Sequence, residues 1–208
     1  MALSPEFVPH QTDIAIIGAG PQALTLVTHL LQKRKRMQGR FIVLDPSGSW
    51  MHQWQHQFAA LEIPHLRSPA VHHPDPNPYA LRRLAESRQN ELLPPYDLPG
   101  TRLFQDFCFD VIRRWQLEDK VLRARVRSIS PLDHRLRPRF RIGLESGHSV
   151  IARRVILAAG SSTPQLPDWV CKIQSPYPQD RLCHSHQIDL RGLQLAREQV
   201  LIVGGGAG

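Results

Sequence analysis

Residues Asp13–Ala23 read DIAIIGAGPQA, an apolar run that ends in a glycine-rich turn. The first part, Asp13–Ile17, has the composition of a buried strand. Leucines and a valine then recur at helical spacing, which predicts a helix over Gln22–Gln32. Another apolar run, Phe41–Leu44, indicates a second buried strand. This strand-helix-strand order implies a parallel sheet, because a crossover helix returns the chain in the same direction.

The turn has the pattern GxGxxA, and each small residue in it has a physical role. The first glycine permits the tight turn, the second lets a phosphate approach the backbone, and Ala23 allows close packing of helix on strand. The helix N-terminus offers free N–H groups and a positive dipole end to an anion. We therefore predict a pyrophosphate site formed by Gly18, Ala19, Gly20, Pro21 and Gln22.

An acidic residue, Asp45, closes the second strand and is followed by Pro46. At this position of a dinucleotide-binding unit a carboxylate accepts hydrogen bonds from ribose hydroxyls and repels a 2′-phosphate. The spacing thus favours FAD or NAD over NADP at this first site. The alternative is an ordinary aspartate that begins the turn Asp45–Ser49, DPSGS.

The rest of the chain predicts a long excursion followed by more sheet. Residues 46–100 hold most of the prolines and histidines and read as an irregular insertion with one helix, Tyr79–Gln89. An amphipathic helix is expected over Arg102–Leu117. After it the pattern predicts a three-stranded meander and one further buried strand: Val121–Ser130, Arg139–Leu144, Ser149–Ala152 and Val155–Ala158.

Two later stretches again join an apolar run to small residues. VILAAG, Val155–Gly160, predicts a strand whose end, Ala159 and Gly160, passes close to a cofactor; a plain core strand is the alternative. VLIVGGGAG, Val200–Gly208, looks like the strand and first glycines, Gly204 and Gly206, of a second GxGxxG. We therefore expect an FAD-binding part over residues 1–198 and the start of a truncated NAD(P)-binding domain over residues 199–208.

Composition narrows the function classes. The formal charge of +8 comes mainly from dispersed arginine clusters, which argues against nucleic-acid binding as the function. The three cysteines form no CxxC, and the histidines lack partners at metal-ligand spacing, so we expect no metal site. No apolar run is long enough to cross a bilayer, and the start lacks signal-peptide character. We expect a cytoplasmic protein without membrane contact.

Beyond these motifs, the chain resembles the N-terminal part of the class B flavoprotein monooxygenases, especially the lysine/ornithine N-hydroxylase-like branch. WMHQW after Asp45 is similar to that family's Trp/His segment beside the flavin, and DPNPYAL is similar to its stretch leading into a helix. TRLFQDFCFDVIRRW is similar to the family's next helix. The resemblance covers nearly the whole chain.

The resemblance implies roles for individual residues. Trp54 lies in the segment beside the flavin, and the backbone of Val126 meets the adenine. The flavin-contacting glutamine of the family falls at Glu62, so glutamate stands in its place. The substrate-contacting lysine falls at Arg67, whose guanidinium can bind a carboxylate. No catalytic side chain is assigned.

The fold expected from all of this is an α/β Rossmann-like FAD-binding domain with a parallel sheet, a three-stranded meander and a long insertion. The resemblance implies FAD in this part, NADPH or NADH in the next domain, and O₂ with an amine or amino acid as substrates. The expected reaction is N-hydroxylation, and the fragment itself is expected to bind FAD weakly and not to turn over. Two alternatives stay open: a pyridine nucleotide–disulfide reductase, and a non-catalytic flavin-binding regulatory protein.

Overall fold

The computed structural model describes residues 9–132, 138–160, 166–173, 182–192 and 200–204. Its centre is a six-stranded sheet in the order β5-β2-β1-β8-β7-β6. Strands β5, β2, β1 and β8 are parallel, whereas β8, β7 and β6 form an antiparallel meander. The strand bounds are Gln11–Ile17 (β1), Phe41–Asp45 (β2), Val121–Arg123 (β5), Val126–Leu132 (β6), Arg139–Leu144 (β7) and Ser149–Leu157 (β8). The predicted parallel sheet and meander are confirmed.

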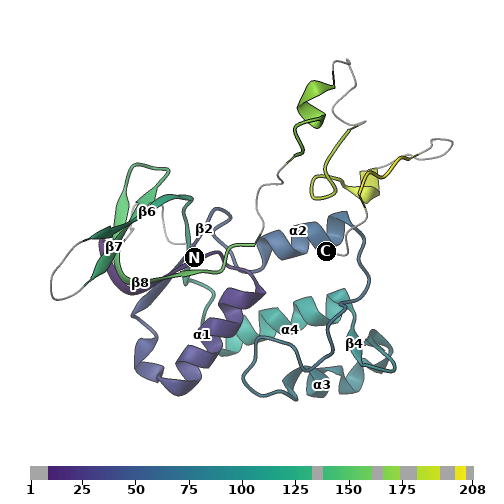
Figure 1. Cartoon of the computed structure of the whole chain (residues 1–208). Helices are drawn as coiled ribbons and strands as arrows, with labels where there is room; N and C mark the ends of the chain where they lie inside the picture. Colours follow the sequence, from purple (N-terminus) through teal and green to yellow (C-terminus); the bar gives the residue numbers. More distant parts are fainter. Residues whose placement is uncertain (1–8, 133–137, 161–165, 174–181, 193–199, 205–208) are drawn as a thin grey trace.

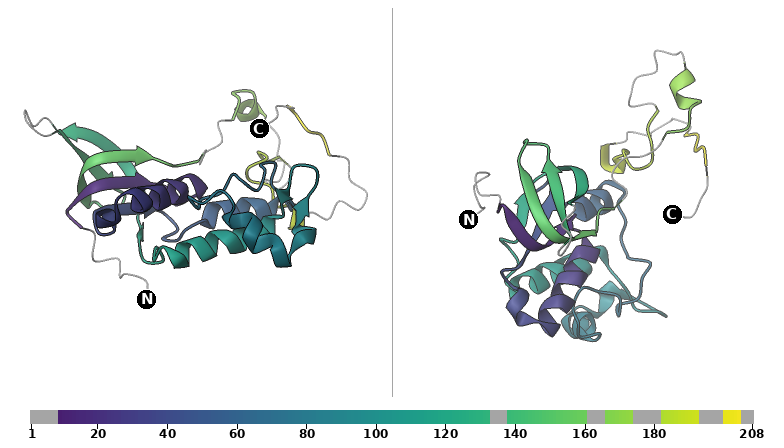
Figure 2. Two further views of the ribbon diagram at one scale, coloured as in Figure 1. Left: turned by 90° about the horizontal axis from the view of Figure 1, so that it is seen from below. Right: turned by 60° about the vertical axis from the view of Figure 1, so that its left-hand side comes forward.

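Helices cover one face of the parallel strands (Figure 1). Alternate residues of β1, Ile14 and Ile16, point into a core shared with Leu24 and Val27 of one helix and Phe107 of another. In Figure 2 the antiparallel meander lies at one end of the molecule and most of the helices lie at the other. The α-helices are Pro21–Lys33 (α1), His52–Ala60 (α2), Ala80–Leu84 (α3) and Thr101–Arg114 (α4).

A smaller core lies on the other side of the sheet, between the parallel strands and the meander. Ala15 of β1 and Leu44 of β2 are buried there with Ile142, Leu144 and Val150 from the meander strands. Two apolar faces on one sheet explain why the central strands read as continuous apolar runs rather than as alternating ones.

The insertion differs from its prediction. Residues 46–100 were expected to hold one helix, but α2 forms before it, and the expected helix is only the short α3 followed by 3₁₀ turns, Ala85–Ser87 and Gln89–Glu91. A small antiparallel pair, β3 (Leu92–Leu93) and β4 (Leu98–Pro99), completes the segment. Further 3₁₀ turns are Lys35–Met37, Val170–Lys172 and Leu190–Gly192.

Three strand predictions are also corrected. The run Val121–Ser130 is two strands, because β5 pairs with β2 and the chain then turns away to pair with β7 as β6. The two strands predicted within residues 149–158 are the single strand β8, which pairs with β7 near its start and with β1 farther along. Residues 200–203 form no strand; a strand is defined by pairing, and no described segment pairs with them.

A buried ion pair fastens the insertion to α4. Asp75 is only 7% exposed, and its carboxylate accepts a hydrogen bond of 2.8 Å from Arg114. The other Asp75 oxygen accepts one from the Asn77 N–H at 2.8 Å. Arg114 also reaches Asp110 at 2.6 Å within the helix.

Arg114→Ala is therefore expected to destabilise the fold by about 2–3 kcal/mol, because it leaves a buried carboxylate without its cation. This loss of stability is smaller than that expected for a fully buried ion pair, because the Arg114 side chain is 44% exposed. Urea unfolding measures the loss. Arg113→Ala is the matched control: Arg113 pairs with Asp110 from a side chain that is 75% exposed, so less than about 1 kcal/mol is expected. Equal losses in the two variants would contradict the role of Asp75.

Candidate nucleotide-binding site

The glycine turn joins the carboxyl ends of three strands. The N–H of Gly18 donates to the Leu44 carbonyl at 2.9 Å, and the N–H of Ala158 donates to the Ile17 carbonyl at 2.8 Å. Gly18 has φ +101°, and a Cβ there would lie 2.6 Å from the Ala158 oxygen. Both the conformation and the close approach require glycine at this position.

The N-terminus of α1 opens directly behind this turn. Gly20 is its extended N-cap residue and Pro21 occupies the first turn, where a missing N–H costs nothing. No side chain caps this end, and the first turn holds no acidic residue. A Cβ on Gly20 would come no closer than 3.8 Å to another group, the Gln22 amide oxygen. The helix end can therefore receive an anion, as expected for the predicted pyrophosphate site.

Asp45 lies against the glycine turn. Its Oδ2 accepts a hydrogen bond from the Ala19 N–H at 3.1 Å, and its Oδ1 accepts from the N–H and hydroxyl of Ser47 at 2.9 and 2.6 Å. The turn-forming alternative is thus observed, together with the contact to the glycine turn. An ionised carboxylate has about four acceptor positions. Three donors leave Asp45 able to accept one more hydrogen bond.

The start of the meander is brought to the same edge of the sheet. The N–H of Ala124 donates to the Asp45 carbonyl at 3.0 Å, directly after β5. Val126, half-buried, begins β6 two residues later. The exposed Pro46 follows Asp45 in a turn whose Gly48, at φ +73°, packs against Arg123, where a Cβ would lie 2.9 Å from the arginine Cβ. Asp45, Pro46 and Val126 therefore belong to one neighbourhood.

The end of β8 lies beside the glycine turn through the Ala158 contacts given above. Ala159 and Gly160 come next and are exposed. A Cβ on Gly160 would meet nothing within 4 Å. The chain therefore contacts Gly18 at Ala158, whereas the next two residues are exposed to solvent.

Helix α2 leads away from the glycine turn. The N–H of Met51 donates to the Ala19 carbonyl at 2.8 Å, so the start of α2 is fixed there. Trp54, in its first turn, stacks on Phe58 with a centroid separation of 4.2 Å and packs against Phe104 at 5.4 Å. Its position is therefore set by an aromatic cluster.

Glu62 and Arg67 lie past the far end of α2. The helix has nine residues and is therefore about 13 Å long, which separates Glu62 from the glycine turn. The segment that holds Arg67 lies against the residues before α4, because the Leu66 N–H donates to the Pro99 carbonyl at 2.9 Å. Glu62 and Arg67 are both exposed, and Glu62 has a left-handed backbone with φ +48°.

The second glycine motif is only partly within the described residues. Gly204 is exposed with φ +105°, and Gly206 lies outside the described residues. The domain boundary near residue 199 stays a prediction.

Sequence reasoning missed three contributors to the site: Ser47, the Met51 N–H and the Ala158 carbonyl. The Asp-x-Ser spacing at Asp45 is a recognisable signal for a side-chain-supported turn. The two backbone contacts have no sequence signal of their own. Gln55 of α2 was also missed; its Nε2 is buried and has no hydrogen-bond partner among the described residues.

Other kinds of site find little support in the described part of the chain. No group of three or more His, Cys, Asp or Glu side chains there could hold a metal ion. Cys108 is buried, and burial raises its thiol pKa well above the ordinary value, whereas Cys183 is exposed; both are free. None of the helices over these ranges has the length and apolar character to traverse a bilayer.

The sheet order, the glycine turn and the uncapped helix behind it define a protein with a Rossmann-type dinucleotide-binding fold. Residues 15–162 match the model of the FAD-NAD(P)-binding family, which is more than two thirds of the chain. The chain belongs to this family, and its cofactors are FAD and a nicotinamide nucleotide. No curated protein matches its sequence.

Two solved structures show the same fold, and a third gives a lower TM-score. The reduced form of the ornithine hydroxylase PvdA from Pseudomonas aeruginosa matches with 19% identity and a TM-score of 0.55, over 78% of this chain and 42% of that one. The polycyclic ketone monooxygenase from Thermothelomyces thermophila matches with 22% identity and a TM-score of 0.52, over 80% and 26%. A flavin-containing monooxygenase from Stenotrophomonas maltophilia gives 22% identity and a TM-score of 0.45, over 74% and 41%. The chain spans less than half the length of each.

Proposed function

We propose that this chain is the FAD-binding part of an NAD(P)H-using flavoprotein monooxygenase of the N-hydroxylating type. The observation that carries the proposal is the meeting of the glycine turn, the open N-terminus of α1 and the Asp45 carboxylate at one edge of the sheet. The family membership and the fold of the ornithine hydroxylase support it.

The residues fit the two ends of FAD differently. The amides behind Gly20 hold the pyrophosphate at the helix N-terminus. Asp45 accepts a ribose hydroxyl at its remaining acceptor position, and Val126 lies where the adenine extends along the start of β6. Ala159 and Gly160 present small residues to the ligand.

The other end of the ligand extends along α2. Trp54 is held by its aromatic neighbours near the turn, and Glu62, past the helix end, would contact the flavin. When bound, the flavin supplies the electron transfer and the reaction with O₂, for which no side chain is suited. Arg67 binds the carboxylate of an amino-acid substrate in this proposal.

The charge of Asp45 decides which nucleotide binds at the first glycine turn. The Asp45 carboxylate repels a 2′-phosphate, so the site around the first glycine turn takes FAD and not NADPH. NADPH or NADH belongs to the domain that we place after residue 199.

The test has two parts. Titration of the chain with FAD, followed by flavin fluorescence, is expected to show saturable binding that NADP⁺ does not displace. A protein that contains this sequence together with the second nucleotide domain is expected to consume NADPH and O₂ when an amine is present, and to form the hydroxylamine. A disulfide reductase would instead reduce an added disulfide without O₂ uptake, and a regulatory flavoprotein would bind FAD but consume no NADPH. No FAD binding by either protein would refute the proposal.

A further inference from the structure

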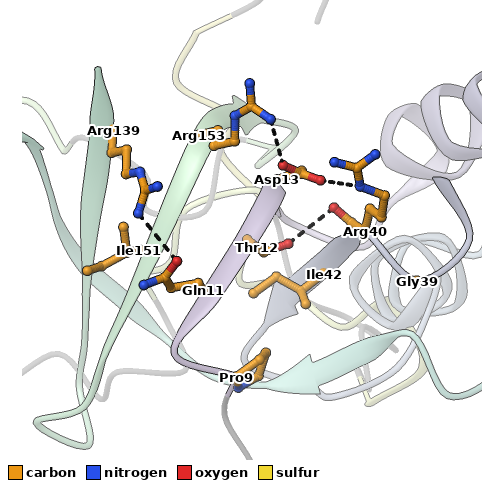
Figure 3. Close-up of a pocket in the computed structure, with 10 residues that line it drawn as sticks. All are labelled: Pro9, Gln11, Thr12, Asp13, Gly39, Arg40, Ile42, Arg139, Ile151 and Arg153. Atoms are coloured by element: carbon orange, nitrogen blue, oxygen red, sulfur yellow. Dashed lines mark hydrogen bonds and ion pairs between the residues drawn. The ribbon is translucent and has the colours of Figure 1, made fainter. Parts of the chain in front are cut away.

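A second polar hollow lies at the opposite edge of the sheet from the glycine turn. It has a volume of about 450 Å³ and is lined from the starts of β1, β2 and β7 and from β8 (Figure 3). Small-molecule sites have volumes of roughly 300–1,000 Å³. Strand β1, with seven residues, separates this hollow from the glycine turn by roughly 20 Å. A ligand here is distinct from the nucleotide.

Arginine dominates the charged lining. Arg40, Arg139 and Arg153 face a single acidic residue, Asp13. Arg40 and Arg153 approach Asp13 from opposite sides, Arg153 at 3.2 Å, as Figure 3 shows. Arg139 donates to the Gln11 amide oxygen at 3.3 Å. The four charged side chains of the lining therefore sum to +2, and Arg139 is the arginine that meets no carboxylate among the lining residues.

Asp13 acts as an internal counter-ion. Its side chain is 18% exposed, and although this partial burial acts to raise the pKa, hydrogen bonds from Arg40 and Arg153 hold the pKa of Asp13 below its usual range. Asp13 thus stays ionised and competes with an external anion for Arg40 and Arg153.

Part of the remaining lining is apolar. Ile42 of β2 and Ile151 of β8 lie half-buried in the hollow, with Pro9 below them in Figure 3. An inorganic ion would leave this surface in water. An anion that carries an apolar group would cover it.

We propose that this hollow binds an organic phosphate, that is, a phosphate monoester on an apolar body. A phosphate monoester carries a charge of about −1.5 to −2 at pH 7, which matches the net charge of the lining. The planar guanidinium of Arg139 suits phosphate oxygens, and Arg153, which meets Asp13 through one of its nitrogens, has further N–H donors. The proposal does not depend on the function proposed above.

Phenyl phosphate is the probe, with binding to the chain followed by calorimetry. Saturable binding is expected, tighter than that of inorganic phosphate. The double variant Arg139→Ala/Arg153→Ala is expected to bind phenyl phosphate about tenfold more weakly, through the loss of charged hydrogen bonds. Asp13→Asn is expected to tighten binding, because it releases two arginines. Arg127→Ala is the control for the loss of an arginine elsewhere, since Arg127 of β6 pairs with Glu145 and lies outside the hollow.

Four results with phosphate ligands would each overturn the proposal. They are the absence of saturable binding, an equal effect of Arg127→Ala, weaker binding by Asp13→Asn, and inorganic phosphate binding as tightly as phenyl phosphate. FAD titration of the same double variant separates the two sites: its FAD affinity is expected to be unchanged. A parallel loss of FAD affinity would place both ligands at the glycine turn and also overturn the proposal. Circular dichroism confirms folding of every variant.

Discussion

Gly18→Ala is expected to reduce the free energy of unfolding by about 3–5 kcal/mol, the sum of backbone strain and forced repacking. At φ +101° an L-residue is strained, and its Cβ would lie 2.6 Å from the Ala158 carbonyl oxygen. The obstacle is backbone of a neighbouring strand, which cannot rotate away as a side chain would. Urea unfolding of the chain measures the loss.

Two other glycines separate the causes. Gly147 has φ +84°, and a Cβ added there would meet nothing within 4 Å, so Gly147→Ala reports strain alone. Gly160 has neither a positive φ nor a neighbour within 4 Å, so Gly160→Ala is expected to be nearly neutral. If Gly18→Ala lowers the free energy of unfolding by no more than Gly147→Ala does, the result contradicts a close contact between the glycine turn and β8.

Asp45→Ala is expected to weaken FAD binding by about 10–100-fold, equivalent to one charged hydrogen bond of about 1.5–3 kcal/mol. The effect follows from the proposed ribose contact and from the hydrogen bond of 3.1 Å that holds Ala19 in the glycine turn. Fluorescence titration measures the affinity, after circular dichroism has shown that the variant folds.

Ser47→Ala is the matched control for Asp45. It removes the hydroxyl donor at 2.6 Å and leaves the carboxylate with a further free acceptor position. FAD affinity is therefore expected to stay the same or to rise slightly. If Ser47→Ala weakens binding as much as Asp45→Ala, the aspartate acts only through the turn that it begins.

Local pattern was enough to predict the first half of the sheet. The apolar run before Gly18, the leucine spacing after it and the run ending at Asp45 each have one compatible structure, and together they require a parallel pair. The positive φ of Gly18 and the missing cap on α1 follow from the same residues.

Helix α2 was missed although its sequence contains a signal. Met51, Trp54, Phe58 and Leu61 recur at helical spacing, but polar histidines and glutamines separate them, and the surrounding prolines favour irregular structure. The short α3 was overestimated because helix-favouring residues, Ala85 and Glu86 among them, continue past Leu84, whereas the backbone tightens into 3₁₀ turns there.

Strand boundaries depended on partners that sequence does not reveal. Nothing local to residues 121–130 shows that β5 pairs with β2 while β6 pairs with β7. The same holds for β8, whose two arginines, Arg153 and Arg154, look like a break between strands. In the structure both are exposed on one continuous strand, Arg153 next to Asp13.

The candidate site was predictable where chemistry and pattern coincide, at the glycine turn and Asp45. Contacts made by backbone atoms, such as the carbonyl of Ala158 against Gly18, were not, because any residue can supply them. The positions of Glu62 and Arg67 depended on the length of α2, which pattern reasoning had left out.

The hydrogen bond from the Met51 N–H to the Ala19 carbonyl joins the glycine turn to the start of α2. Whatever orders the turn also fixes the origin of the helix, and the aromatic cluster of Trp54, Phe58 and Phe104 carries that order across to α4. In the function proposed above, we expect a phosphate bound at the turn to affect the orientation of residues one helix length away.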